Sequence, residues 1–227
     1  MQLVFLLFLI AIVGTMWGRM RFLKVYGEES TNLISSRLTG AELAEAILRK
    51  RGIESVSIAK GYGLLPDFYD PDRRRLTLAP QHFGGSGFSA LALAALQAGK
   101  AIQQQESHKP LLWRNSAVRA SVYLTPPLFV IGLFTLLVGM SKTLLPIVIL
   151  SWSLVTFWNF LTVPTEVDAG LRVKRELEEM RVFRNLDERI GVERVIGAAS
   201  TASIDGFSIV ASWLARRFLP WMREKTD

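Results

Sequence analysis

Long stretches without charge constrain this chain more than any other feature. Residues 1–18, 120–141 and 143–165 contain no Asp, Glu, Lys or Arg. An α-helix needs about 20 predominantly apolar residues to cross the hydrocarbon core of a bilayer, so the second and third stretches are long enough to span. Because little more than Lys142 separates them, they are predicted to form a transmembrane hairpin.

The first stretch has the charge pattern of a membrane anchor. Arg19, Arg21 and Lys24 follow it directly, and no positive charge precedes it. A secretory signal peptide begins with positive charge and ends in a small-residue cleavage site, neither of which is present here. We therefore expect an uncleaved anchor with its N-terminus outside, and a cleaved signal peptide is the alternative.

A fourth apolar segment, residues 195–215, is rich in Ala, Ser and Thr and carries Asp205 near its centre. A carboxylate in mid-bilayer costs about 3 kcal/mol on insertion scales, so a spanning helix here would need protein around Asp205. Small residues suit such close helix packing. The segment is therefore either a fourth transmembrane helix or a soluble helix packed on the rest of the protein.

Basic residues near the spans predict the orientation, because they favour the cytoplasmic side. They flank the spans at Arg19, Arg21, Lys24, Lys109, Arg114, Arg119, Arg172, Lys174 and Arg175. The predicted order is an anchor (1–18), a cytoplasmic domain in two parts (19–118 and 164–194), a transmembrane hairpin (119–163) and a C-terminal part (195–227). If the fourth segment spans the membrane, the basic residues of this C-terminal part lie outside the cell, against the tendency of basic residues to stay on the cytoplasmic side.

The charge of the chain limits its possible partners, and its lack of cysteine limits its possible cross-links and metal sites. Lys and Arg total 27 against 20 Asp and Glu, and Cys is absent, which excludes disulfides and thiolate metal sites. A basic excess suits nucleic acid and anionic membranes equally, and the apolar stretches decide for the membrane. We therefore expect lipid and no nucleic acid as a partner. The run "DRRR" at 72–75 is expected to be a solvated rim, with contact to anionic lipid as the alternative.

Local signals predict a mainly α fold with a small β-hairpin, an α+β class. Thr39 and Glu42 have capping-box spacing at the start of a helix, and Gly52 stands where a C-cap glycine belongs. Residues 54–61 and 74–80 alternate as two short strands with a turn between them. "GGSG" at 84–87 is expected only to introduce the next helix, because no "GK[ST]" follows as in a phosphate-binding loop.

Residues 91–105, "LALAALQAGKAIQQQ", are predicted to form one helix. This helix belongs to a series of motifs that resembles the neutral zinc metallopeptidases of bacterial membranes. That family has, in order, "TGAE", "DHYDP", "VRLS", "AAHEVGHAIQ" and "LPVEFDAS". This chain has "TGAE" at 39–42, "DFYDP" at 67–71, "LTLA" at 76–79, "AALQAGKAIQ" at 94–103 and "VPTEVDAG" at 163–170. Five matches in register over the whole chain imply a membrane-embedded, zincin-like fold with three or four transmembrane helices.

The residues that handle zinc in the family are replaced here. In H-E-x-x-H peptidases two His four residues apart share a helix face and bind zinc, and the Glu activates its water. This chain has Leu96, Gln97 and Lys100 at those positions, and Phe68 replaces the His of "DHYDP". Leu has no lone pair, the Gln amide is a negligible base and protonated Lys repels a dication.

The resemblance implies that Glu166 is the former third zinc ligand and Asp168 its supporting carboxylate. A carboxylate left there without metal would be a buried unpaired charge, which is strongly disfavoured. Lys100 is therefore predicted to lie within about 4 Å of Glu166 or Asp168, the usual ion-pair distance. The alternative is a Lys100 that reaches solvent and contacts neither carboxylate.

Other candidate catalytic groups are few. His82 and His108 lie before and after the helix, and each is more simply a boundary residue than part of a rebuilt metal site. Ser86 and Ser89 lie near the helix start without a general base that the sequence can identify. We expect no catalytic residue and no metal, so zinc is predicted to be lost.

The sequence therefore predicts a catalytically inactive metallopeptidase homologue, a pseudopeptidase, in which the helix is kept for packing. It would be an integral protein of the bacterial cytoplasmic membrane whose main domain faces the cytoplasm. It would bind a polypeptide segment or a partner membrane protein through the former substrate groove. The alternative is an active enzyme: a membrane-bound zinc metallopeptidase, or another hydrolase with a non-standard site.

Overall fold

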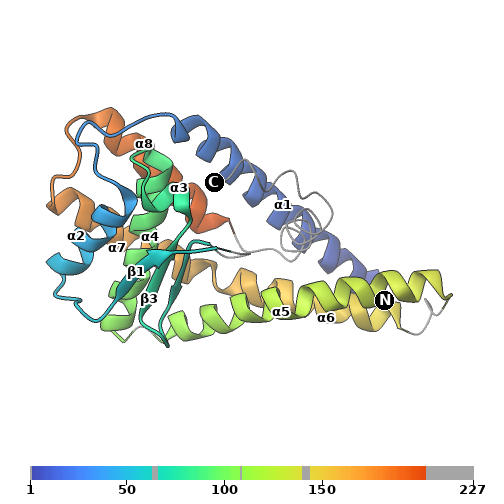
Figure 1. Cartoon of the computed structure of the whole chain (residues 1–227). Helices are drawn as coiled ribbons and strands as arrows, with labels where there is room; N and C mark the ends of the chain where they lie inside the picture. The colour runs from blue at the N-terminus through green and yellow to red at the C-terminus, as the bar shows by residue number, and fades with distance from the viewer. Residues whose placement is uncertain (1, 63–65, 108, 140–143, 203–227) are drawn as a thin grey trace. The chain divides into compact units, whose positions relative to one another are not determined.

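The structure, a computed structural model, describes residues 2–62, 66–107, 109–139 and 144–202 (Figure 1). These residues form a mainly helical chain with a small sheet. The elements are α1 (Gln2–Ser30), α2 (Gly40–Lys50), β1 (Ser57–Lys60), β2 (Phe68–Asp70), β3 (Arg75–Leu78), α3 (Pro80–Phe83), α4 (Phe88–Gln105), α5 (Pro110–Leu137), α6 (Leu145–Leu161), α7 (Val163–Glu179) and α8 (Leu186–Thr201).

The chain divides into two compact units. Of the described residues, 2–19, 113–139 and 144–162 form the apolar unit, and 20–62, 66–107, 109–112 and 163–202 form the α+β domain. Helix α1, predicted to span with residues 1–18, continues past Gly18 to Ser30, so its second half belongs to the domain.

The apolar unit contains helices that are long and apolar enough to cross a membrane. Within the described residues the two candidates are Pro110–Leu137, which is α5, and Leu145–Glu179, which runs through α6 into α7. They overlap the predicted spans at 120–141 and 143–165, and the connection at 140–143 lies outside the described residues. Asn159 of α6 donates a hydrogen bond to the Ser121 hydroxyl of α5. Buried polar contacts of this kind help to hold apolar helices together.

The predicted fourth apolar segment begins inside α8. Val195 and Ile196 are fully buried in the core of the α+β domain, and α8 ends at Thr201. These residues therefore pack on the domain as a soluble helix would. The boundary expected at residue 195 falls within one continuous helix, and residues 203–215, with Asp205, lie outside the part that the structure describes.

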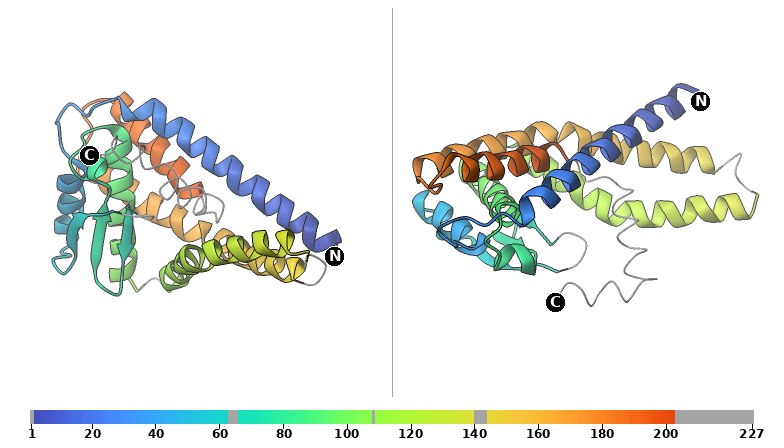
Figure 2. Two further views of the ribbon diagram at one scale, coloured as in Figure 1. Left: turned by 45° about the vertical axis from the view of Figure 1, so that its right-hand side comes forward. Right: turned by 90° about the horizontal axis from the view of Figure 1, so that it is seen from above.

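Helix α4 is the centre of the α+β domain. Its side chains are buried from Phe88 to Gln103, as expected for a helix that is apolar on every side. It contacts α2, α7 and α8 as well as β2 and β3, and the views in Figures 1 and 2 show it enclosed by these elements. The helix predicted over 91–105 is confirmed, and its position explains why its small and apolar residues are needed.

The close approach of α4 to α7 depends on Gly99. A Cβ atom at Gly99 would lie 2.6 Å from the carbonyl oxygen of Ala169 and 3.5 Å from the Cβ of Val173. The backbone carbonyl of Ala169 is held in α7 and cannot move aside as the end of a flexible side chain can. The α4–α7 contact, which positions the candidate site below, therefore requires a residue without a side chain here.

Gly99→Ala should lower the free energy of unfolding of the domain by about 1–3 kcal/mol, the usual cost of overpacking a core. The matched control is Gly197→Ala in α8, where a Cβ meets nothing within 4 Å. That change should be neutral or stabilise by up to about 1 kcal/mol, because Ala has the higher helix propensity. Thermal unfolding of the detergent-purified chain compares the two, and equal effects would contradict the proposed close contact.

The ends of α2 agree with the sequence. The Thr39 hydroxyl accepts a hydrogen bond from the Glu42 backbone N–H at 3.3 Å, and Glu42 accepts one from the Thr39 backbone N–H at 2.8 Å. The predicted capping box is therefore confirmed. Gly52 follows the helix with a φ of +65°, the left-handed conformation that glycine adopts most readily, so the predicted C-cap glycine is confirmed as well.

The sheet has the two predicted strands but a different topology. The segment between them carries a third strand, β2, and the strand order is β1-β3-β2. β2 pairs antiparallel with β3, while β1 pairs parallel with β3 on its other side. The expected hairpin between the first and second predicted strands is thus wrong, because the intervening residues are numerous enough to form the hairpin partner themselves.

Candidate functional site

The site predicted from the sequence lies where α4 faces the first turn of α7. The Lys100 ammonium is 3.0 Å from a Glu166 carboxylate oxygen and 3.1 Å from the side-chain oxygen of Gln97. The Lys100 residue is 2% exposed, and the Glu166 side chain is 14% exposed. The predicted ion pair is confirmed, and the alternative of a solvent-directed Lys100 is wrong.

Lys100 and Leu96 occupy one face of α4 because they are four residues apart. Leu96 is 3% exposed and belongs to the hydrophobic core of the domain. Gln97, at the position of the family's catalytic Glu, is also buried and accepts the hydrogen bond from Lys100. The three replaced motif positions thus form a packed surface of one apolar, one amide and one cationic side chain.

Asp168 accepts hydrogen bonds from Gln103 of α4 and from Arg172 of its own helix. The side-chain amide of Gln103 donates to Asp168 at 2.7 Å and to the backbone carbonyl of Thr165 at 2.9 Å. Arg172, one turn along α7, donates to the same carboxylate at 2.6 Å. Gln103, which this chain shares with the family motif, therefore fixes the start of α7 against α4 and so helps to place Glu166 beside Lys100.

The "DFYDP" segment packs against the C-terminal end of α4. Tyr69 of β2 is 1% exposed, and its hydroxyl donates a hydrogen bond to Gln104. Gln104 in turn donates to the carbonyl of Pro71 at 2.9 Å. Burial raises the pKa of Tyr69 to about 12, so this residue is a hydrogen-bond donor in the core and remains protonated. Phe68, where the family has His, lies opposite Thr77 of β3.

His82 is more than the boundary residue that the sequence indicated. It is 5% exposed, with Nδ1 2.8 Å from a carboxylate oxygen of Asp67 and Nε2 2.8 Å from the hydroxyl of Tyr26. A carboxylate only accepts, so Nδ1 carries a proton toward Asp67, while Nε2 shares a hydrogen bond with the Tyr26 hydroxyl, a group that can donate or accept. Sequence reasoning missed this chain of contacts because its members come from α1, α3 and the segment before β2. Both imidazole nitrogens are engaged, which leaves neither available to a metal.

The serines near the start of α4 contact backbone. Ser89 donates to the carbonyl of Tyr26 at 2.9 Å, and Ser86 donates to that of Arg37 at 3.1 Å. Both tie the start of α4 to preceding segments, the structural role expected of them. His108, the other candidate for a rebuilt site, lies outside the described residues.

The residues at the site do not fit a zinc ion. Zinc sites in proteins use Cys thiolate, imidazole and carboxylate ligands, and the motif positions on α4 and α7 offer only the carboxylates of Glu166 and Asp168. The ammonium of Lys100 stands within 3.0 Å of Glu166 and would repel a dication. Across the described residues no group of three or more His, Asp or Glu is placed to hold a metal.

Comparison with known proteins defines the class of protein that carries this site. The family model described as "Putative neutral zinc metallopeptidase" matches residues 4–215. The chain belongs to this family, as its motifs predicted.

A curated relative is "Putative membrane protease YugP" of Bacillus subtilis (strain 168). It is 32% identical over 202 residues, which cover 87% of this chain and 88% of the relative. No solved structure matches this chain. The similarity spans both units, so it includes the apolar helices as well as the α+β domain.

Proposed function

We propose that this chain is a catalytically inactive member of its metallopeptidase family that acts by binding a polypeptide segment or a partner membrane protein. The observation that carries the proposal is the ion pair between Lys100 and Glu166. It joins Lys100, at the position of the second motif His, to Glu166, the residue that the resemblance implies as the former third zinc ligand. For the alternative, an active hydrolase with a non-standard site, the described residues contain no group of three or more His, Asp or Glu placed to hold a metal.

The ion pair supports loss of zinc for a chemical reason. A metal ligand must offer a lone pair, which an ammonium does not, and a buried ammonium stabilises the adjacent carboxylate in place of the metal. The Gln97 amide cannot take a proton from water near neutral pH. The former ligand pair, base and metal are thereby replaced by one hydrogen-bonded cluster that keeps α4 and α7 together.

The proposed location follows from the apolar helices and the relative's description as a membrane protease. We place α1 as an anchor and α5 and α6 as a transmembrane hairpin of a bacterial cytoplasmic membrane. Basic residues beside these helices favour a cytoplasmic position for the α+β domain. Lipid is then a constant partner, and the former substrate groove is the proposed surface for the protein partner.

The detergent-purified full chain should contain no stoichiometric zinc and should not cleave unfolded casein in a zinc-dependent way. The reason is the donor set at the motif positions, which offers the carboxylates of Glu166 and Asp168 and no imidazole. Elemental analysis and a fluorescence cleavage assay measure the two quantities.

Zinc binding at micromolar affinity with cleavage that a chelator abolishes would contradict the proposal. Cleavage that survives chelation would instead support the alternative of a hydrolase without a metal. A Glu166→Gln variant serves as the control, because zinc held at this site would be lost from it and adventitious zinc would remain.

A further inference from the structure

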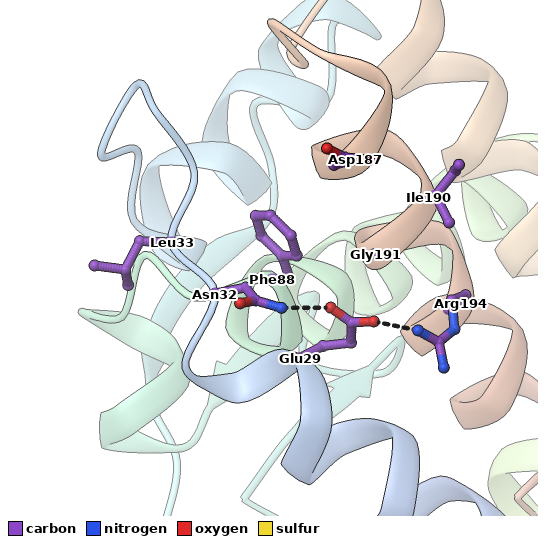
Figure 3. Close-up of a pocket in the computed structure, with 8 residues that line it drawn as sticks. All are labelled: Glu29, Asn32, Leu33, Phe88, Asp187, Ile190, Gly191 and Arg194. Carbon is purple, nitrogen blue, oxygen red and sulfur yellow. Dashed lines mark hydrogen bonds and ion pairs between the residues drawn. The ribbon is translucent and has the colours of Figure 1, made fainter.

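A cavity of about 370 Å³ opens at a part of the α+β domain that the site above does not use (Figure 3). It lies where the end of α1 and the following loop meet the starts of α4 and α8. The residues that the argument uses are Glu29, Leu33, Phe88, Asp187, Ile190 and Arg194.

The floor of the cavity is apolar and closely packed. Phe88 is 6% exposed, and its ring lies against Gly191. A Cβ atom at Gly191 would be 2.4 Å from a carbon of that ring, so the glycine is needed for the ring to lie there. Leu33 and Ile190 form an apolar rim and are 66% and 48% exposed.

Two of the charged groups on the cavity wall, Glu29 and Arg194, form an ion pair, and Asp187 lies apart from them. The Glu29 carboxylate is buried and accepts hydrogen bonds from Asn32 at 2.9 Å and Arg194 at 2.7 Å. Arg194 also pairs with Glu28 at 3.0 Å, so two carboxylates share its guanidinium. Figure 3 shows Asp187 away from this group.

Asp187 is exposed, and it makes no ion pair or side-chain hydrogen bond within the described part of the chain. The charged residues that line the cavity are Glu29, Asp187 and Arg194, which leaves it with one excess negative charge. The chain as a whole has a formal charge of +7. This cavity is therefore an acidic site on a basic protein.

We propose that this cavity binds a basic side chain, Arg or Lys, of a polypeptide partner, with Asp187 accepting the charged head. The aliphatic stem of such a side chain can cover apolar surface while its head stays near water, which fits the exposed rim of Leu33 and Ile190. Apolar neighbours on the partner would cover the rest of that rim. Charge complementarity selects this occupant over an acidic or purely apolar segment.

The inference rests on the proposed binding role and adds the chemistry of the partner. It uses residues separate from Lys100 and Glu166. Proteolysis by the unmodified chain would therefore contradict the proposed function but would not test the binding of a basic side chain in this cavity. The peptide comparison below tests that binding alone.

The test uses the full chain in detergent and two fluorescein-labelled peptides, Gly-Leu-Arg-Leu-Gly and the same peptide with citrulline for arginine. Citrulline keeps the shape of the side chain and removes its charge. The arginine peptide should bind about fivefold more tightly by fluorescence anisotropy, the effect of one exposed charge pair, with the difference shrinking as salt rises. Asp187→Asn should remove the difference.

The control variant is Glu54→Gln, which neutralises an exposed carboxylate outside the cavity and should keep the preference for arginine. Equal affinity for the two peptides would overturn the inference, as would an equal loss in the Glu54→Gln variant. Concentration-dependent dimerisation abolished by Asp187→Asn would also overturn it, since the occupant would then be a second copy of this chain. Unchanged thermal unfolding of Asp187→Asn shows that the variant is folded.

Discussion

Lys100→Met should lower the free energy of unfolding of the α+β domain by about 3–5 kcal/mol. The substitution keeps the volume of the side chain but leaves the Glu166 carboxylate, 14% exposed, without the ammonium at 3.0 Å. Removing one partner of a buried ion pair is strongly destabilising because the remaining charge stays desolvated. Chemical denaturation in detergent, followed by far-ultraviolet circular dichroism, measures the change.

The double variant Lys100→Met with Glu166→Gln separates this charge effect from lost packing. It removes both charges, so it should lower the free energy of unfolding much less than the single variant does. Arg49→Met is a surface control, because Arg49 pairs with Glu45 where both side chains are more than half exposed, and it should cost under about 1 kcal/mol. If the double variant is as unstable as the single one, the ion pair does not explain the stability.

Local and register-based features of this protein could be predicted from the sequence. The capping box at Thr39 depends on residues three apart, and the Gly52 C-cap depends on one backbone conformation, so both follow from a short window. The Lys100–Glu166 pair joins residues far apart in the chain. It was predictable because the family motifs place both residues at one metal site, and a charge left there needs a partner.

Features that depend on tertiary packing were not predictable in the same way. Strand alternation located β1 and β3 but carried no information on which strand pairs with which, so the parallel pairing and the intervening β2 were missed. His82 is a single polar residue in the sequence, and its partners Tyr26 and Asp67 are brought to it only by folding. No periodicity or motif connects these three positions.

The apolar segment that begins at residue 195 shows the limit of hydropathy. A core helix of a folded domain and a membrane span are both apolar, and small residues suit close packing in either setting. The buried Val195 and Ile196 show that the start of this segment belongs to the domain core. Burial against α4 and α7, which the sequence does not display, distinguishes the two.

Restoring the family's residues through Leu96→His, Gln97→Glu and Lys100→His together should recover tight binding of one zinc per chain. The two introduced imidazoles would lie four residues apart on one face of α4, and Glu166 already lies 3.0 Å from the ammonium that the third substitution removes. Two imidazoles and a carboxylate form a known catalytic zinc ligand set. The expected change is from no measurable zinc affinity to sub-micromolar affinity, measured by calorimetry and elemental analysis in detergent.

Adding Glu166→Gln to this triple variant tests the geometry that supports the prediction. An amide is a poor replacement for a carboxylate ligand. Losing a group that only supports a zinc ligand already lowers metal affinity by roughly tenfold, so losing the ligand itself should lower zinc affinity by at least that factor. Asp168→Asn is the matched comparison and should cost less, because Asp168 already accepts hydrogen bonds from Gln103 and Arg172. Zinc binding that is insensitive to Glu166→Gln would show that α7 does not supply the third ligand. The Lys100–Glu166 pair would then be an ordinary core contact, unrelated to a former metal site.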